Sequence, residues 1–216
     1  MEKISPSIGY NRKYIYWGIF FLIVQILAIM RNMQVGFLNF FWYCDFAPGV
    51  FSILFFLKTN QAIKGFLSIG LIPQLIYIFS MIYYAFSGTI LFGFDLENLG
   101  ALYFISTFII HLSSILALIA VYRVKPKKIA LLYSLIFLAI IQSIVITFIF
   151  ANNTLSGNYN YIYSPGNLSL PYYTQLWTLI AFVILAIPTY LIQKIIYNKL
   201  NPKLRDKNKK SRTEFG

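Results

Sequence analysis

Six long apolar runs follow one another along the chain, and short segments with charged residues, Gly, Pro or Asn separate them. A helix needs roughly 20 apolar residues to cross the hydrocarbon core of a bilayer. The runs cover residues 14–30, 37–57, 65–86, 100–122, 129–151 and 172–192. This pattern predicts an all-α, polytopic membrane protein in which residues 1–198 form a six-helix transmembrane bundle. Pro73 lies near the middle of the third run, which we interpret as one kinked span.

The composition agrees with a membrane protein. Of the 216 residues, 59% are hydrophobic and only 11% are charged, too few to coat a water-soluble domain of this size. No small-residue cleavage pattern follows the first run. We therefore interpret that run as a retained first span and not as a removable signal peptide.

The basic residues predict how the chain is oriented. With the N-terminus inside, 17 of the 18 Lys and Arg residues fall in cytoplasmic segments, and only Arg31 falls in an outer loop, residues 31–36. Asp95 and Glu97 lie in the outer loop after the third run. Because Lys and Arg concentrate in cytoplasmic loops, both termini are predicted to be cytoplasmic. In a prokaryote the location would be the cell membrane.

Residues 199–216 are polar and basic and have no apolar periodicity, which predicts a disordered cytoplasmic tail. Its Lys and Arg side chains suit anionic lipid headgroups, although a solvated topology anchor is the favoured interpretation. The net charge of +12 is spread over the inner segments, as topology requires, so nucleic acid is not an expected partner. The oligomeric state is not readable from these patterns.

The chain has one cysteine, Cys44, and one histidine, His111. A single cysteine excludes an intramolecular disulfide and a zinc site built from cysteine pairs, and a single histidine excludes a multi-histidine cluster. We therefore expect no metal and no cofactor. Asn152 and Asn167 begin N-x-[ST] patterns, which matter only if the host is a eukaryote.

Polar residues inside a span are costly and are functional candidates by default. Cys44 and Asp45 lie in the second run, roughly 10 Å deep, and His111 lies in the fourth, roughly 16 Å deep. Both runs lead from outside to inside, so a contact is geometrically possible. Thr107 and Ser114 share a helical face with His111.

Cys44 and His111 together form a candidate nucleophile and its base, because a buried thiol needs a neighbour to accept its proton. Each also has a plainer interpretation, as a small buried side chain and as a structural hydrogen bonder. Asp45 either orients the imidazole or pairs with Arg31. Other candidates for the same interior, many of which we expect to join helices to each other, are Gln74, Gln142, Ser143, Thr147 and Thr178.

Four segments, taken in order, resemble the YwaF-type integral membrane proteins, relatives of the animal transmembrane protein 164. They are Phe41-Trp42-Tyr43-Cys44-Asp45, Phe108-Ile109-Ile110-His111, Tyr122-Arg123-Val124-Lys125-Pro126-Lys127 and Asn158-Tyr159-Asn160-Tyr161-Ile162-Tyr163-Ser164-Pro165. The resemblance implies acyl transfer between membrane lipids through a cysteine thioester. Cys44 would then be the acyl-accepting nucleophile, His111 its base, and Asn158 and Tyr159 part of an outer cap. The chain is also distantly similar to the androgen-induced gene 1 hydrolases, which use threonine and histidine.

Three hypotheses stay open on the sequence. The first is a lipid acyltransferase or acyl hydrolase in which Asn158, Gln142 or Thr107 supplies donors to the oxyanion. The second is a non-enzymatic transporter or lipid-binding bundle whose polar stripe lines a path. Only Asp45 and His111 are ionisable within the predicted spans, which is few for a proton relay. The third is a scaffold protein that acts through its basic tail.

Overall fold

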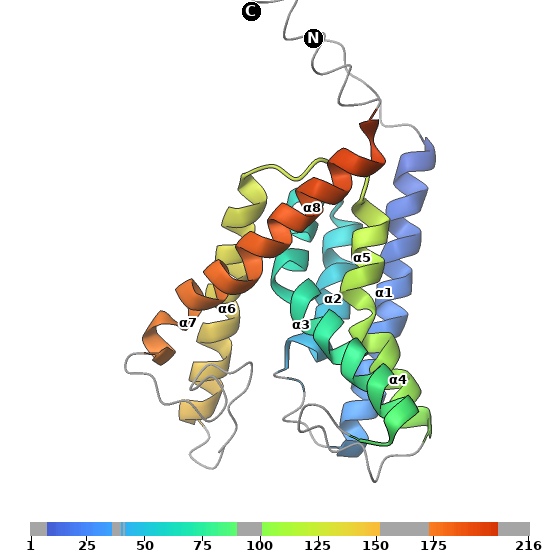
Figure 1. The fold of residues 1–216 in the computed structure, drawn as a ribbon, viewed down its shortest axis with the longest axis vertical. Helices are drawn as coiled ribbons and strands as arrows, with labels where there is room; N and C mark the ends of the chain where they lie inside the picture. The colour runs from blue at the N-terminus through green and yellow to red at the C-terminus, as the bar shows by residue number, and fades with distance from the viewer. Residues whose placement is uncertain (1–7, 36–39, 41, 90–100, 152–172, 203–216) are drawn as a thin grey trace, which may run out of the picture.

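The computed structural model describes residues 8–35, 40, 42–89, 101–151 and 173–202. Within these residues the chain is all-helical, which confirms the predicted class (Figure 1). The elements are α1 (Ile8–Val35), α2 (Tyr43–Phe56), α3 (Asn60–Ser87), α4 (Ala101–His111), α5 (Ser113–Val121), α6 (Ile129–Ala151), α7 (Tyr173–Ala181), the π-helix η3 (Phe182–Ala186) and α8 (Ile187–Leu200).

Several of these elements join into longer rods. Leu112, between α4 and α5, keeps helical backbone angles, and its amide donates to the Phe108 carbonyl at 3.0 Å, so α4 and α5 form one rod. The segments α7, η3 and α8 follow each other without a gap. Five rods of the described chain are long and apolar enough to cross a membrane, an architecture compatible with a multi-pass membrane protein. Helix α2, with 14 residues, is shorter than these five, so the sixth membrane crossing stays a prediction. The orientation of the chain in the membrane also stays a prediction.

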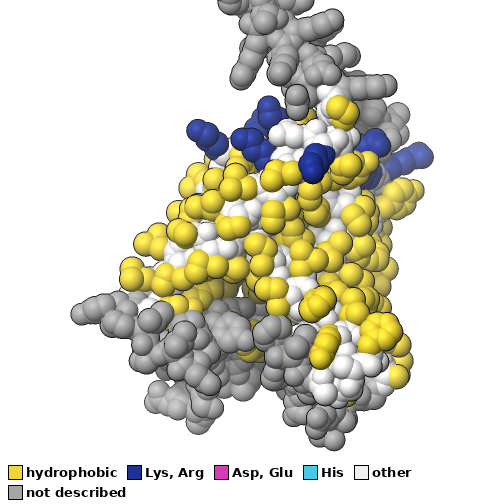
Figure 2. Space-filling view, in the orientation of Figure 1, with side chains coloured by type: hydrophobic (Ala, Val, Ile, Leu, Met, Phe, Trp, Pro, Cys, Tyr) yellow, Lys and Arg dark blue, Asp and Glu magenta, His cyan; other side chains and the backbone are white. Residues whose placement is uncertain are grey.

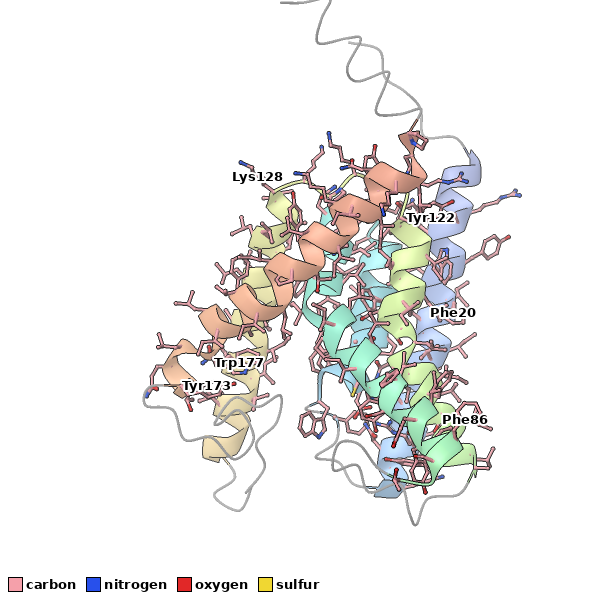
Figure 3. All side chains as sticks on the ribbon, viewed as in Figure 1. Phe20, Phe86, Tyr122, Lys128, Tyr173 and Trp177 are labelled. Atoms are coloured by element: carbon pink, nitrogen blue, oxygen red, sulfur yellow. The ribbon has the colours of Figure 1, made fainter. Side chains whose placement is uncertain are left out.

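The outward faces of the helices carry large apolar side chains, including Phe79, Val183 and Ile23, each more than half exposed. Figure 2 shows that Lys and Arg gather at the end of the molecule where α1 begins and α8 ends. Tyr122 and Lys128 lie near this basic end, whereas Phe86 lies at the opposite end (Figure 3). An apolar belt with cations gathered at one end is what a lipid environment favours.

Aromatic rings fill the contact between α1 and α2 and reach α3. Phe21 of α1 stacks on Phe55 of α2 with ring centroids 5.4 Å apart, and Phe51 meets Phe66 of α3 edge to face at 5.1 Å. Between α1 and α2, Ser52 Oγ donates a hydrogen bond to the Gly18 carbonyl at 2.8 Å. Large rings and a polar bond across a close helix contact are how membrane helices hold together.

Helix α3 packs against α2, α5, α6 and α8, and a glycine allows its close approach to α6. A Cβ atom on Gly65 would lie 2.5 Å from the Ala130 carbonyl oxygen. Ser134 Oγ donates to the Gly65 carbonyl at 2.9 Å, across the same contact. The backbones of α3 and α6 are therefore in close contact at Gly65.

We predict that Gly65→Ala destabilises the protein by about 1–3 kcal/mol, because the added methyl group forces two helix backbones apart. The melting temperature of the purified protein in detergent measures this. Gly18→Ala is the matched control. There the added Cβ meets the ring of Phe56, which is 42% exposed and can swing outward, so a smaller loss is expected. Equal losses in the two variants would contradict the close contact.

The structure changes four local expectations. Helix α1 continues to Val35, so Arg31 lies inside a helix and not in the predicted outer loop. Helix α2 begins at Tyr43, which places Cys44 in its first turn and not two turns deep. Ser143 and Thr147 are exposed, so the expectation that they face the interior was wrong. Lys64, expected in an inner segment, is fully buried within α3.

Other expectations keep their status. Helix α3 runs through Pro73 as one helix, as predicted. Asp95, Glu97, Asn152, Asn167 and residues 203–216 of the tail lie outside the described residues.

Candidate functional site

Cys44 lies at the second position of α2, where the Asp45 amide donates to the Trp42 carbonyl at 3.0 Å. Its side chain is partly buried and packs against a small cluster made by Val24 and Ala28 of α1 and Ile110 of α4. Ile110 directly precedes His111. The helix that carries the thiol therefore touches the helix that carries the imidazole, next to both residues.

Arg31 of α1 forms a buried ion pair with Asp45 of α2. Its Nη1 donates to Thr107 Oγ1 of α4 at 3.2 Å, and its Nε and Nη2 donate to Asn32 Oδ1 at 3.0 and 2.8 Å. Its guanidinium also lies 5.5 Å from the ring centre of Tyr103. Arg31 thus ties the Cys44 helix to the His111 helix. Of the two roles considered for Asp45, the structure has the pairing with Arg31.

His111 is 3% exposed, and its Nδ1 lies 2.8 Å from the Thr107 carbonyl oxygen. A carbonyl only accepts hydrogen bonds, so in this contact Nδ1 carries the hydrogen and a neutral ring keeps its lone pair on Nε2. Tyr77 of α3 stacks on the imidazole with ring centres 3.6 Å apart and planes 9° from parallel. The ring is held by one hydrogen bond and one stacking partner, and Nε2 is the atom available as a base.

Tyr77 also connects the imidazole to the Cys44 side of the site. Its hydroxyl lies close enough to Cys44, Asp45 and Arg31 to interact with them electrostatically.

Tyr43, the neighbour of Cys44, crosses from α2 to α3. Its hydroxyl donates to the Phe66 carbonyl at 3.0 Å. Gly70 makes room for the ring, since a Cβ atom there would lie 2.0 Å from a Tyr43 ring carbon. The first turn of α2 is therefore anchored on both sides of the thiol, by Tyr43 and by Asp45.

Gln74 provides a polar group one turn before Tyr77. Its Oε1 accepts a hydrogen bond from the Ser114 amide at 2.8 Å. Its Nε2 is buried and has no hydrogen-bond partner among the residues that the structure describes. Gln74 and Ser114 thus pair across α3 and α5 beside the pair Tyr77 and His111, and leave one buried donor unused.

The structure gathers most of the predicted site residues into one region: Cys44, Asp45, Gln74, Thr107, His111 and Ser114. Gln142 lies in a different contact, where it bonds to Thr178 and to the Thr174 carbonyl of α7. Asn158 and Tyr159 are outside the described residues. Within the described chain no hydrogen bond joins Cys44 to His111, and no three His, Cys, Asp or Glu side chains are placed to hold a metal ion.

Sequence reasoning missed several groups that build the site. Gln25 of α1 donates to the Asp45 carbonyl at 3.0 Å and accepts from the Gly49 amide at 2.7 Å, which fixes the start of α2. Arg31 was considered only as a partner of Asp45 and not as a link to Thr107, and Asn32 and Tyr77 were not considered. The sequence did contain an indication of this polar face of α1, because Gln25 and Asn32 are seven residues apart and share a helical face. Aromatic stacking on histidine has no such signature.

Comparison with protein-family models, curated proteins and solved structures finds no match to this chain. The case for a function therefore rests on the residues of the site.

Proposed function

We propose that this chain is a cysteine-dependent lipid acyltransferase or acyl hydrolase of the membrane, with Cys44 as nucleophile and His111 as base. The observation that carries the proposal is the Arg31 link, which bonds both to Asp45, next to Cys44, and to Thr107, whose carbonyl holds His111. A buried guanidinium that bonds to both helices would hold Cys44 and His111 at a fixed position relative to each other. The resemblance to the YwaF-type proteins points to the same chemistry.

The proposal includes a topology of six spans with both termini inside. Helix α2 has 14 residues and a length of about 21 Å, less than the roughly 30 Å of a bilayer core. If α2 is one of the six spans, its first turn, and hence Cys44, would lie below the outer surface of the membrane. The exposed cations gather at the end where α1 begins, and this supports a cytoplasmic assignment for that end.

In the first half of the reaction, His111 Nε2 takes the proton of the Cys44 thiol, and the sulfur attacks the carbonyl carbon of a lipid ester. A new C–S bond forms, the ester C–O bond breaks, and the alcohol leaves with the proton from His111. The Asp45 carboxylate, next in the chain to the sulfur, would oppose a thiolate, and its ion pair with Arg31 offsets that negative charge.

In the second half, water or a lipid hydroxyl attacks the thioester while His111 Nε2 removes its proton. The C–S bond breaks and the proton returns to the thiol, which regenerates the enzyme. With water the net reaction is hydrolysis, and with a lipid hydroxyl it is transfer. Gln74 Nε2, a buried donor with no partner in the described chain, is suited to the negative oxygen that develops on the carbonyl.

A lipid acyl probe tests the proposal, because the chain has only one cysteine. The purified full-length protein is incubated in detergent with a phospholipid that carries an alkyne-tagged acyl chain, and bound alkyne is detected before and after hydroxylamine. Hydroxylamine cleaves a thioester at neutral pH and leaves amides intact. We expect a labelled, hydroxylamine-sensitive adduct, and peptide mapping is expected to place it on Cys44.

The result that would overturn the proposal is the absence of any sensitive adduct while the protein is folded and binds the same lipid. That outcome would favour the non-enzymatic, lipid-binding bundle. Labelling at neutral pH followed by a rapid acid quench, which unfolds the protein and stops both half-reactions, guards against turnover of the thioester before detection.

A further inference from the structure

A second group of buried polar atoms belongs to α3 and α8, two helices that are in contact. Lys64 of α3 is fully buried, and its Nζ has no hydrogen-bond partner among the described residues. Asp45 is the only acid in the described part of the chain, and it is paired with Arg31. A buried ammonium without a counter-charge is strongly unfavourable, and an anion bound next to Nζ would stabilise it.

Helix α8 contributes two more such atoms. Gln193 Nε2 donates to the Lys64 carbonyl at 3.1 Å and to Ser68 Oγ at 2.7 Å, which seats α8 on this part of α3. The other end of the same amide, Gln193 Oε1, is buried without a partner in the described chain, and so is Thr189 Oγ1. Thr189 precedes Gln193 by one turn and shares its face.

The three buried atoms without partners, Lys64 Nζ, Thr189 Oγ1 and Gln193 Oε1, indicate which chemical groups a ligand would need. An ammonium and a hydroxyl both donate to phosphate oxygens. Gln193 Oε1 only accepts, so it needs a hydroxyl on the same ligand. We propose that Lys64, Thr189 and Gln193 bind a phosphate group that carries a neighbouring hydroxyl, as a phosphoglycerol lipid headgroup does. This site is separate from the Cys44 region and does not depend on the proposed reaction.

The place of the site in the fold fits a headgroup. Lys64 is four residues into α3, about 6 Å along the axis from Asn60, and α3 starts at the basic end of the molecule. Anionic headgroups of one leaflet meet that end if the chain spans the membrane as proposed. A phosphate at this depth is within reach of a lysine that otherwise has no counter-charge.

Helix α8 also has a place where it can bend. The π-helix η3 (Phe182–Ala186) ends where α8 begins, and Pro188 lies in the first turn of α8. π-helical turns inside a helix are frequent at functional sites, and proline removes one backbone hydrogen bond. Bending at this segment would separate α8 from α3 and give a headgroup access to atoms that are buried when the two helices are in contact.

The test measures binding of phosphatidylglycerol and of soluble glycerol 3-phosphate to the full-length protein in a neutral detergent, with phosphatidylcholine as the comparison lipid. Native mass spectrometry gives the affinities. We expect phosphatidylglycerol to bind in preference to phosphatidylcholine, and Lys64→Met to weaken it by about tenfold or more. Thr189→Val is expected to weaken it by about threefold. Binding of glycerol 3-phosphate with the same dependence on Lys64 would identify a soluble phosphate as the source.

Lys194→Met is the matched control, because Lys194 is adjacent to Gln193 but exposed, and it is expected to leave the affinity unchanged. Lys64→Met removes a buried unpaired charge, so the variant is expected to fold at least as well as the parent, and the melting temperature checks this. Equal affinity in Lys64→Met and the parent would overturn the proposal. So would failure of both phosphates to bind, which would leave water as the ligand of these atoms.

Discussion

Replacing His111 by glutamine is expected to slow acylation of Cys44 by about 10²- to 10⁴-fold, the usual contribution of a general base. His111 keeps its lone pair on Nε2 because Nδ1 is used by the Thr107 carbonyl at 2.8 Å. A glutamine amide fills similar space and still donates to a carbonyl, but it cannot accept the thiol proton. The rate of hydroxylamine-sensitive labelling by the acyl probe measures the change.

Two variants make this result specific. Cys44→Ala removes the only thiol and must abolish the sensitive adduct, which sets the background. Thr178→Val alters a polar contact between α6 and α7 outside the Cys44 region, so its labelling rate is expected to match the parent. If His111→Gln labels as fast as the parent and remains folded, His111 is a structural hydrogen bonder and another group takes the proton.

Helical periodicity explains why part of the site could be predicted from the sequence. Thr107, His111 and Ser114 lie four and three residues apart, and the structure places all three in the buried interior. The same reasoning was wrong for Ser143 and Thr147. A polar residue can satisfy its hydroxyl within its own helix, as Ser143 does by donating to the Ala139 carbonyl at 2.8 Å, and then face outward.

Arg31 shows what the apolar pattern could not provide. Its charge ended the first apolar run in the sequence, so the residue was interpreted as part of a loop. In the structure α1 continues to Val35, because the guanidinium is neutralised by Asp45 and satisfied by Asn32 and Thr107. Where a charge finds its partners in another helix, a hydropathy pattern alone places the helix end too early.

The start of α2 was misplaced for a related reason. Residues 37–57 read as one apolar run, yet the helix begins only at Tyr43. Its first turn is set by contacts from other helices, namely those of Gln25 with the Asp45 carbonyl and of Tyr43 with the Phe66 carbonyl. Such contacts depend on tertiary packing, and no local spacing encodes them.

The buried pair of Arg31 and Asp45 leads to the second large prediction. Arg31→Met leaves the Asp45 carboxylate buried without its counter-charge and is expected to destabilise the protein by about 3–5 kcal/mol. For a chain of this size the melting temperature is expected to fall by roughly 6–20 °C. Thermal denaturation of the purified protein in detergent measures the change. Arg12→Met, at an exposed position of α1, is the matched control and is expected to change stability by less than about 0.5 kcal/mol.

The double variant Arg31→Met with Asp45→Leu separates stability from the positioning role. Replacing both partners removes the unpaired charge, so most of the lost stability is expected to return. The bond from Arg31 to Thr107, and with it the link between the Cys44 and His111 helices, stays broken. The double variant is therefore expected to melt near the parent temperature but to acylate Cys44 more slowly. Recovery of both stability and acylation rate would mean that the ion pair serves folding alone, and that packing of Cys44 against Ile110 suffices to hold the two helices in place.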